Sequence, residues 1–297
     1  MYDVIIVGCG PAGLTAGIYL RRAGKKVLIL EKDTIGGQMA SSPLIENYPG
    51  YEKISGNELA LKMYEQATNL GVDIEIEEVL KIEKDKVITE DNKYIYKTLI
   101  IATGAKYRKL GLPNEDNLIG AGIHFCALCD GSFYKDKIIA VVGGGNSAAI
   151  NSLYLSQIAS KVYLIYRKDK LKCEKILEEK LFNKENIEIL YNTTVQKLNG
   201  QSELESIIIK QDNENKELKI DGLFESIGME AETKNFSSFL DIDENNYLIH
   251  DNTRTKYDNV FVAGDCTKKD VRQITTAIND GATAAIYAIN YLNREKD

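Results

Sequence analysis

The chain has 297 residues, 44% of them hydrophobic and 27% charged, which is enough for two domains with a core each. Its formal net charge of -7 disfavours nucleic acid as a partner, because binding a phosphate backbone needs a basic face. No stretch reaches the roughly 18 apolar residues of a membrane-spanning helix, and the start lacks the basic region of a signal peptide, so a cytoplasmic protein with no membrane partner is expected.

The chain opens with an apolar strand that runs into a glycine loop, and the same pattern returns in its middle. Residues 2–13 read YDVIIVGCGPAG and residues 137–148 read KIIAVVGGGNSA. Small residues stand at the same three places in both loops, namely Gly8, Gly10 and Gly13 in the first and Gly143, Gly145 and Ala148 in the second. The repeat predicts two copies of one supersecondary unit.

Each glycine loop leads into a helix and then into a second apolar strand. Helices are predicted over 14–24 and 149–159, and the second strands over 26–33 and 161–169. Glycines at this point let the backbone approach a pyrophosphate, and the helix N-terminus offers free N–H groups to the anion. The pattern therefore predicts two dinucleotide-binding units, although a doubly wound fold can carry such a loop and bind nothing.

The remaining segments suggest that the second unit is inserted into the first. Strand-like runs follow it up to residue 228, and a strand ending at Gly264 and Asp265 then leads to a helix over 272–292. This tail has the pattern of a return to the first domain. The predicted fold class is α/β, with two Rossmann-like dinucleotide-binding domains, the second inserted into the first. The predicted boundaries lie near Gly111 and Leu240, which gives a first domain of 1–111 and 241–297 and a second of 112–240.

The ends of the second strands distinguish the two ligands. In these folds that position meets the adenosine ribose. In the first copy it is Glu31, whose carboxylate accepts from a free 2′-OH and repels a 2′-phosphate, so FAD or NAD is expected. In the second copy Arg167, Lys168 and Lys172 supply positive charge, which suits the 2′-phosphate of NADP. The alternative for these cations is the solvated start of a surface helix.

A close cysteine pair, Cys126 and Cys129, lies just before the second copy and can form a disulfide. In a cytosolic chain this spacing indicates redox chemistry or half of a zinc site. Zinc needs four ligands, and the other cysteines and histidines are isolated in the sequence: Cys9, Cys173, Cys266, His124 and His250. Redox chemistry is therefore preferred and no metal is expected.

Together these motifs resemble the low-molecular-weight, bacterial-type thioredoxin reductases over nearly the whole chain. The motifs are GCGPAG at 8–13, GGQ at 36–38, ENYPGY at 46–51, ATGA at 102–105, CALCDGSFY at 126–134, GGGNSA at 143–148, VFVAGD at 260–265 and RQI at 272–274. The resemblance implies an FAD-binding domain built from both ends of the chain, a pyridine-nucleotide domain that carries the cysteine pair, and a homodimer.

The resemblance also implies site residues. For FAD these are Gly8, Gly10, Pro11, Ala12, Gly13, Glu31, Lys32, Gly36, Gly37, Gln38, Asn47, Thr103, Gly104, Gly264, Asp265, Arg272, Gln273 and Ile274. For NADPH they are Gly143, Gly145, Asn146, Ser147, Arg167, Lys168 and Lys172. Cys129 would lie against the flavin, Cys126 would attack the disulfide of thioredoxin or a similar small protein, and Asp130 would be the acid/base.

The departures from the family all fall in the second domain or at its end. A family His-Arg-Arg with a later Arg is here Tyr166-Arg167-Lys168 with Lys172, and an Ile-Gly-His-x-Pro-Asn segment is here residues 227–232. Point charges thus replace two planar guanidinium groups. NADPH remains the expected donor, with ferredoxin or NADH as alternatives. A peroxiredoxin is an alternative partner, and a non-enzymatic flavin-binding protein is the competing class.

Overall fold

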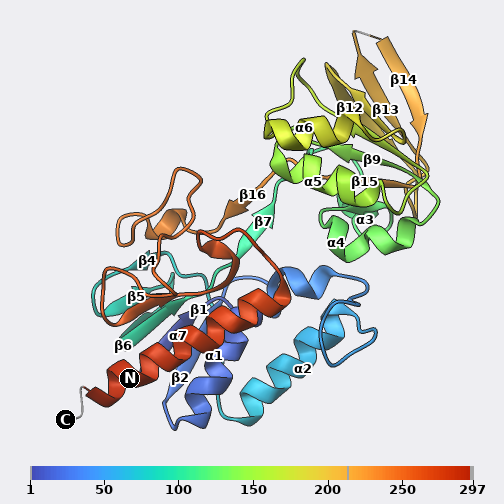
Figure 1. The fold of residues 1–297 in the computed structure, drawn as a ribbon. Coiled ribbons are helices and arrows are strands. Elements are labelled where there is room, and N and C mark those ends of the chain that lie inside the picture. The colour runs from blue at the N-terminus through green and yellow to red at the C-terminus, as the bar shows by residue number, and fades with distance from the viewer. Residues whose placement is uncertain (1, 213, 295–297) are drawn as a thin grey trace. The chain divides into compact units, whose positions relative to one another are not determined.

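The computed structural model describes residues 2–212 and 214–294, which form two compact units. The first unit is made from both ends of the chain, 1–106 and 230–297, and the second from residues 107–229 (Figure 1). The second unit is therefore inserted into the first, as predicted. No helix in the described part of the chain is both long and apolar enough to span a bilayer.

The first unit is built on a mostly parallel sheet of seven strands in the order β3-β2-β1-β6-β5-β4, with β17 also paired to β6. The strands are β1 (Tyr2–Val7), β2 (Val27–Glu31), β3 (Asp73–Ile76), β4 (Lys81–Ile82), β5 (Lys86–Ile88), β6 (Lys93–Ile101) and β17 (Val260–Val262). β17 pairs with β6 in parallel, so the C-terminal segment completes the sheet that the N-terminal strand began.

Three long helices, α1 (Pro11–Arg22), α2 (Gly56–Asn69) and α7 (Ile274–Arg294), cover one face of this sheet (Figure 1). Val4 and Ile6 of β1 point into their core, whereas Ile5 and Val7 point to the opposite face. A Cβ on Gly281 of α7 would come within 2.1 Å of the Ala12 carbonyl oxygen, so this glycine permits the close packing of α7 on α1. Short 3-10 helices complete the unit: η1 (Gly37–Ser41), η3 (Lys234–Phe236) and η4 (Gly264–Cys266).

The second unit has a parallel sheet of five strands in the order β11-β10-β9-β15-β8, which confirms the predicted fold class. Its strands are β8 (Ile123–His124), β9 (Ile138–Val142), β10 (Lys161–Ile165), β11 (Ile187–Leu190) and β15 (Gly222–Glu225). The helices are α3 (Glu115–Leu118), α4 (Ala127–Asp130), η2 (Gly131–Tyr134), α5 (Asn146–Leu155) and α6 (Lys175–Phe182). An antiparallel meander follows α6 and β11, formed by β12 (Thr193–Asn199), β13 (Ser206–Gln211) and β14 (Glu214–Lys219).

The two segments that connect the units pair with each other as β7 (Ala105–Tyr107) and β16 (Met229–Ala231). The change of unit lies at 106/107 and 229/230, whereas the sequence placed the boundaries near Gly111 and Leu240. Beyond β16, Phe236, Phe239 and Leu240 pack in the same buried cluster as Ile5 and Val7, so residues 230–240 belong to the first unit. Hydrophobic contacts, rather than any linker composition, set this boundary.

Candidate functional site

The first glycine loop packs against the protein at Gly8 and has free space beside Gly10. Gly8 has a φ of 106°, and a Cβ there would lie 2.3 Å from the Ala102 carbonyl oxygen. Gly10 precedes α1, no side chain caps that helix, and a Cβ on Gly10 would meet no atom within 4 Å. The first N–H groups of α1 therefore remain available to an anion that lies over Gly10.

The Glu31 carboxylate, at the end of β2, is buried and held by the backbone. It accepts from the N–H of Cys9 at 2.6 Å and from the N–H of Asp33 at 2.9 Å. The neighbouring Lys32 forms an ion pair with Glu232. These three side chains line a cavity of about 390 Å³, and residues 230–236 form a continuous part of its lining. The sequence did not point to 230–236 as part of a site, although this segment overlaps residues 227–232, where the chain departs from the family motif.

Two polar side chains in this unit match the requirements of a polar ligand. Oδ1 of Asp265 is buried and has no hydrogen-bond partner among the described residues, and Oγ1 of Thr103 is buried with only the Cys266 thiol beside it. Such orphaned atoms are costly unless a ligand or water satisfies them. Burial raises the pKa of the Asp265 carboxyl, although Lys269 and Arg272 oppose that rise. The residues present therefore fit a ligand whose hydroxyl groups hydrogen-bond at this edge.

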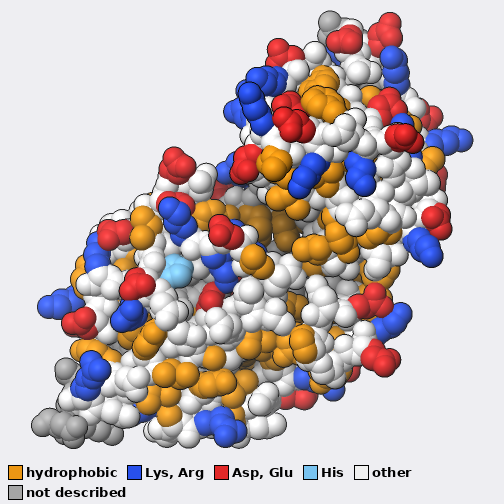
Figure 2. All heavy atoms as spheres, viewed as in Figure 1, with side chains coloured by type: hydrophobic (Ala, Val, Ile, Leu, Met, Phe, Trp, Pro, Cys, Tyr) orange, Lys and Arg blue, Asp and Glu red, His pale blue; other side chains and the backbone are white. Residues whose placement is uncertain are grey.

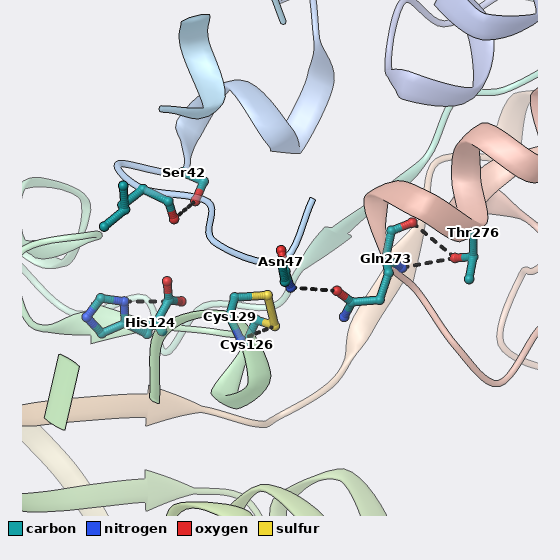
Figure 3. The surroundings of a disulfide bond; sticks show 9 residues. Ser42, Asn47, His124, Cys126, Cys129, Gln273 and Thr276 are labelled. Atoms are coloured by element: carbon teal, nitrogen blue, oxygen red, sulfur yellow. Dashed lines mark hydrogen bonds and ion pairs between the residues drawn. A yellow bond between two sulfur atoms is a disulfide. The ribbon is translucent and has the colours of Figure 1, made fainter. Parts of the chain in front are cut away.

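The start of α7 brings two more of the expected FAD residues together. Asn47 donates through Nδ2 to Oε1 of Gln273 at 3.3 Å, and the N–H of Gln273 donates to Oγ1 of Thr276 at 3.1 Å (Figure 3). Arg272 is engaged differently, because its guanidinium donates to the carbonyls of Lys269 and Thr267 and lies 4.2 Å from the Tyr247 ring centre. Arg272 thus fixes the loop that carries Asp265.

The other expected FAD residues lie in this same unit. Pro11, Ala12 and Gly13 are in the first turn of α1, Gly36 precedes η1, Gly37 and Gln38 begin it, Gly104 follows β6, Gly264 begins η4, and Ile274 begins α7. A Cβ on Gly13 would come within 2.0 Å of the Gly8 carbonyl oxygen, so the helix and the loop are in direct contact. No larger residue fits at Gly13 without moving the loop.

The second glycine loop repeats this geometry in the second unit. Gly143 has a φ of 150° and its Cβ would lie 2.4 Å from the Ser226 carbonyl oxygen. Gly145 precedes α5, whose first residues are Asn146 and Ser147, and a Cβ on Gly145 would again meet nothing within 4 Å. The loop is therefore also open on the side from which a pyrophosphate would approach.

The basic residues of this unit lie on an irregular loop that is tied to the glycine loop. The N–H of Lys172 donates to the Gly144 carbonyl at 2.7 Å, and the Asn146 amide and Glu174 exchange two hydrogen bonds of 2.9 Å. Arg167, Lys168 and Lys172 are exposed, with no ion pair to the described residues. These cations precede α6, which begins at Lys175, so they lie on a solvated loop rather than within the helix.

The cysteine pair forms a disulfide at the start of α4, with the two Cα atoms 5.3 Å apart (Figure 3). The N–H of Cys129 donates to Sγ of Cys126 at 3.2 Å, and such a contact stabilises a thiolate there once the bond is reduced. Leu128, between the cysteines, is 60% exposed, so the pair borders on solvent. Residues 2–212 and 214–294 contain no group of three or more His, Cys, Asp or Glu placed to hold a metal ion.

His124 is not isolated, as the sequence suggested, but contacts the expected acid/base. Its Nδ1 lies 3.3 Å from Oδ2 of Asp130 and its Nε2 lies 2.6 Å from the hydroxyl of Tyr134. All three side chains are buried, and the imidazole packs on Phe224 of the adjacent strand β15. The only sequence signal was the position of His124, two residues before Cys126.

The sequence pattern of the family "Pyridine nucleotide-disulphide oxidoreductase" matches residues 2–281. The thioredoxin reductase of Bacillus subtilis is 41% identical over 300 residues, covering 98% of this chain and 95% of that protein. A 34.2 kDa protein in the rubredoxin operon of Clostridium pasteurianum is also 41% identical, over 98% of this chain and 97% of its own. The crystal structure of thioredoxin reductase from Streptococcus pyogenes superposes with a TM-score of 0.95 at 40% identity, covering 99% of both chains.

Proposed function

The chain belongs to the pyridine nucleotide-disulphide oxidoreductase family and, within it, to the thioredoxin reductases, and we propose that it passes electrons from NADPH through FAD and the Cys126–Cys129 pair to thioredoxin. Members of this family use FAD and NADPH. The observation that carries the proposal is the disulfide at the start of α4, next to a buried carboxyl, in a chain with two open glycine loops.

FAD fits the first unit. We assign its pyrophosphate to the open side of Gly10, its adenosine to the cavity beside Glu31, and its polyol hydroxyls to Asp265. When bound, FAD carries the two electrons between the nicotinamide and the disulfide. The chain itself binds the cofactor, holds the glycine loops in place, and donates and accepts the protons of the dithiol.

For the dithiol chemistry we assign to the two cysteines and Asp130 the roles that the family resemblance implies. Two electrons and two protons convert the Cys126–Cys129 disulfide to two thiols. Cys126 then attacks the disulfide of thioredoxin as a thiolate, forming a mixed disulfide and releasing one partner sulfur. Cys129 attacks Sγ of Cys126, which restores the internal disulfide and releases the second partner sulfur. Asp130 supplies and accepts the protons of these steps.

The proposed electron donor is NADPH. The open side of Gly145 and the three exposed cations Arg167, Lys168 and Lys172 support NADPH, because a 2′-phosphate carries the complementary charge. NADH would leave these cations without a partner. Ferredoxin as donor would leave both the cations and the loop without a role.

The experiment compares NADPH, NADH and reduced ferredoxin in anaerobic stopped-flow reduction of the yellow holoprotein, followed by reduction of thioredoxin. We expect about one FAD per chain, bleaching by NADPH, and formation of reduced thioredoxin. Cys126→Ser and Cys129→Ser should each bind FAD and be reduced by NADPH, yet fail to reduce thioredoxin. Cys126→Ser should also show a long-wavelength absorbance from a Cys129 thiolate beside the flavin, and its occurrence in Cys129→Ser instead would reverse the assigned roles. Bleaching by ferredoxin alone would replace NADPH as the donor.

We also propose a homodimer in the cytoplasm, where thiols are kept reduced. Figure 2 shows apolar side chains grouped over the part of the first unit that carries α1 and α7. Tyr19 and Ile286, which belong to these helices, are 44% and 47% exposed. Analytical ultracentrifugation tests the dimer, and a monomer at micromolar concentration would exclude it.

A further inference from the structure

Asp130 is a buried carboxyl whose environment supplies one basic side chain. Among the described residues His124 is the only basic one within 4 Å of this carboxylate, with Nδ1 at 3.3 Å from Oδ2. Asp130 follows Cys129 directly, and its own N–H donates to the Cys126 carbonyl at 3.1 Å. The backbone is thus fixed by α4, whereas the carboxyl group is oriented by the imidazole.

Asp130 and Tyr134 together fix the tautomer and the orientation of that imidazole. The Tyr134 hydroxyl lies 2.6 Å from Nε2, and burial raises the pKa of this phenol, so the hydroxyl keeps its proton. The Asp130 carboxylate can only accept, so a neutral His124 carries its ring proton on Nδ1, and Nε2 then accepts from the Tyr134 hydroxyl. The ring is held between Tyr134, whose centre is 5.3 Å away at an angle of 72°, and Phe224, also at 5.3 Å.

Building on the proposed function, we propose that His124 is a positioning residue that, with Tyr134, orients and stabilises the Asp130 carboxylate for proton exchange with the Cys126–Cys129 dithiol. Each turnover takes Asp130 from the carboxylic acid to the carboxylate when it protonates a leaving thiolate, and back again when it accepts a thiol proton. A buried carboxylate without a donor is unfavourable. The Nδ1–H of His124 supplies that donor and fixes the direction in which the carboxylate points.

The charged groups around Tyr134 are one lysine and three carboxylates. Nζ of Lys137 lies 5.4 Å from the Tyr134 ring centre, and the negative charges of Asp130, Asp221 and Glu203 add to burial in raising the pKa of its hydroxyl. Phe224, which stacks on the His124 ring, is apolar. Among the described residues, Asp130 is thus the only acidic side chain within 4 Å of His124.

The test compares His124→Phe with His124→Asn, because the asparagine amide nitrogen falls near the position of Nδ1 and can still donate. In His124→Phe we expect FAD content and flavin reduction by NADPH to stay within about twofold, while thioredoxin-dependent turnover falls about tenfold to a hundredfold, as for the loss of a hydrogen bond to a charged group. His124→Asn should recover most of that loss. Tyr134→Phe, which keeps the ring, should lose less than His124→Phe. The double variant His124→Phe/Asp130→Asn should be no slower than Asp130→Asn.

A second readout needs neither NADPH nor thioredoxin. In dithiothreitol-reduced protein, the rate of iodoacetamide alkylation of the dithiol is followed from pH 5.5 to 9. The profile of His124→Phe should move in the same direction as that of Asp130→Asn, and the profile of His124→Asn should match wild type. An unmoved profile in His124→Phe, or equal defects in His124→Phe and His124→Asn, would overturn the positioning role. Failure of wild type to reduce thioredoxin would instead contradict the proposed function and leave this assay decisive.

Discussion

The backbone N–H of Cys9 donates to the Glu31 carboxylate over 2.6 Å, so the first glycine loop is tied to the end of its second strand by a charged hydrogen bond. In the second copy Tyr166 takes the place of Glu31 and Gly144 that of Cys9, and there the tie is an aromatic ring lying against the glycine. In both copies the glycine loop is tied to the end of the second strand, by a charged hydrogen bond in the first and by a packed aromatic ring in the second. This difference lets each loop be tested separately.

Removing the carboxylate in Glu31→Ala should weaken FAD binding. The carboxylate is the acceptor expected for the ribose 2′-OH, and one hydrogen bond to a charged group contributes about 1.5–3 kcal/mol, so a loss of about tenfold to a hundredfold in affinity is expected. Flavin fluorescence on dilution of the holoprotein measures the release of FAD. Asp33→Asn is the control, because the Asp33 side chain is 67% exposed and its carboxylate contacts only Lys106 at 3.5 Å among the described residues. Equal retention of FAD by Glu31→Ala and wild type would contradict the assignment.

Alanine at two adjacent glycines of the second loop should affect different properties: the stability of the fold at Gly144 and the binding of NADPH at Gly145. A Cβ on Gly144 would lie 2.2 Å from the ring of Tyr166, which is itself buried, whereas a Cβ on Gly145 meets no atom within 4 Å. Gly144→Ala should therefore lower the free energy of unfolding by about 1–3 kcal/mol, as overpacking does. Gly145→Ala should keep its stability and raise KM for NADPH, because its methyl group stands where the pyrophosphate would approach. Urea denaturation and steady-state kinetics on both variants measure these effects, and a normal KM in Gly145→Ala would argue against that placement.

Much of the fold could be predicted because it depends on local sequence. The apolar runs before Gly8 and Gly143 became β1 and β9, and the repeat alone gave the βαβ units. The helices begin earlier than predicted, at Pro11 and Asn146 rather than at 14 and 149, because Gly10 and Gly145 themselves precede the first helical residue. The apolar periodicity that predicts a helix does not extend into the first turn after the glycine, so it places the start of each helix too late.

The parts that sequence reasoning missed depend on distant partners. His124 contacts Asp130 nearby in the chain, but its ring is buried against Phe224 of β15, a strand that follows much later in the sequence. In the same way, the place of residues 230–240 in the first unit rests on contacts of Phe236 and Phe239 with β1, at the other end of the sequence. A pattern in one chain carries no information on such pairings.

A buried carboxyl pair should make stability depend on pH. Oε2 of Glu225 and Oε1 of Glu115 share the N–H of Leu110 at 3.1 and 2.9 Å, and both side chains are buried. Burial, and then the charge of Glu115, raise the pKa of Glu225 to about 8 from an ordinary value of 4.5. Between these values the folded protein holds a proton that the unfolded chain has lost. Stability is therefore highest at the acid end of this interval and falls by up to about 1.4 kcal/mol per pH unit until the pH passes the folded pKa.

Glu225→Gln should remove most of this dependence. The amide cannot ionise, so the unfolding midpoint of the variant in urea should change less between pH 5 and pH 8 than that of wild type. Glu205→Gln, an exposed glutamate in the same unit, is the matched control and should keep the wild-type slope. Parallel curves for wild type and Glu225→Gln would show that Glu225 is ionised in the folded protein.

The last prediction concerns Arg167 and the choice between NADPH and NADH. Arg167 is exposed on the loop that the backbone N–H groups of Lys172 and Glu174 fasten to the second glycine loop and to Asn146 of α5. Only a guanidinium makes two parallel hydrogen bonds to a phosphate, and on this exposed loop solvent screening limits the pair together to about 1.5–3 kcal/mol. Arg167→Ala should thus reduce kcat/KM for NADPH about tenfold to a hundredfold. NADH has no 2′-phosphate, so its kcat/KM should stay the same.

The lysines of the same loop give the internal comparison. Lys168 and Lys172 carry a point charge without the two fixed donors of a guanidinium, so Lys168→Ala and Lys172→Ala should lower kcat/KM for NADPH less than Arg167→Ala does. Their effect should shrink as salt is raised from about 0.05 to about 0.5 M, where the Debye length falls well below 10 Å. Lys180 is an exposed cation in the last turn of α6, and Lys180→Ala should leave kcat/KM unchanged for both NADPH and NADH. The decisive quantity is kcat/KM for NADPH divided by that for NADH. If this ratio is the same in wild type and Arg167→Ala, Arg167 does not read the phosphate, and the charge of the loop acts only by attracting the nucleotide from a distance.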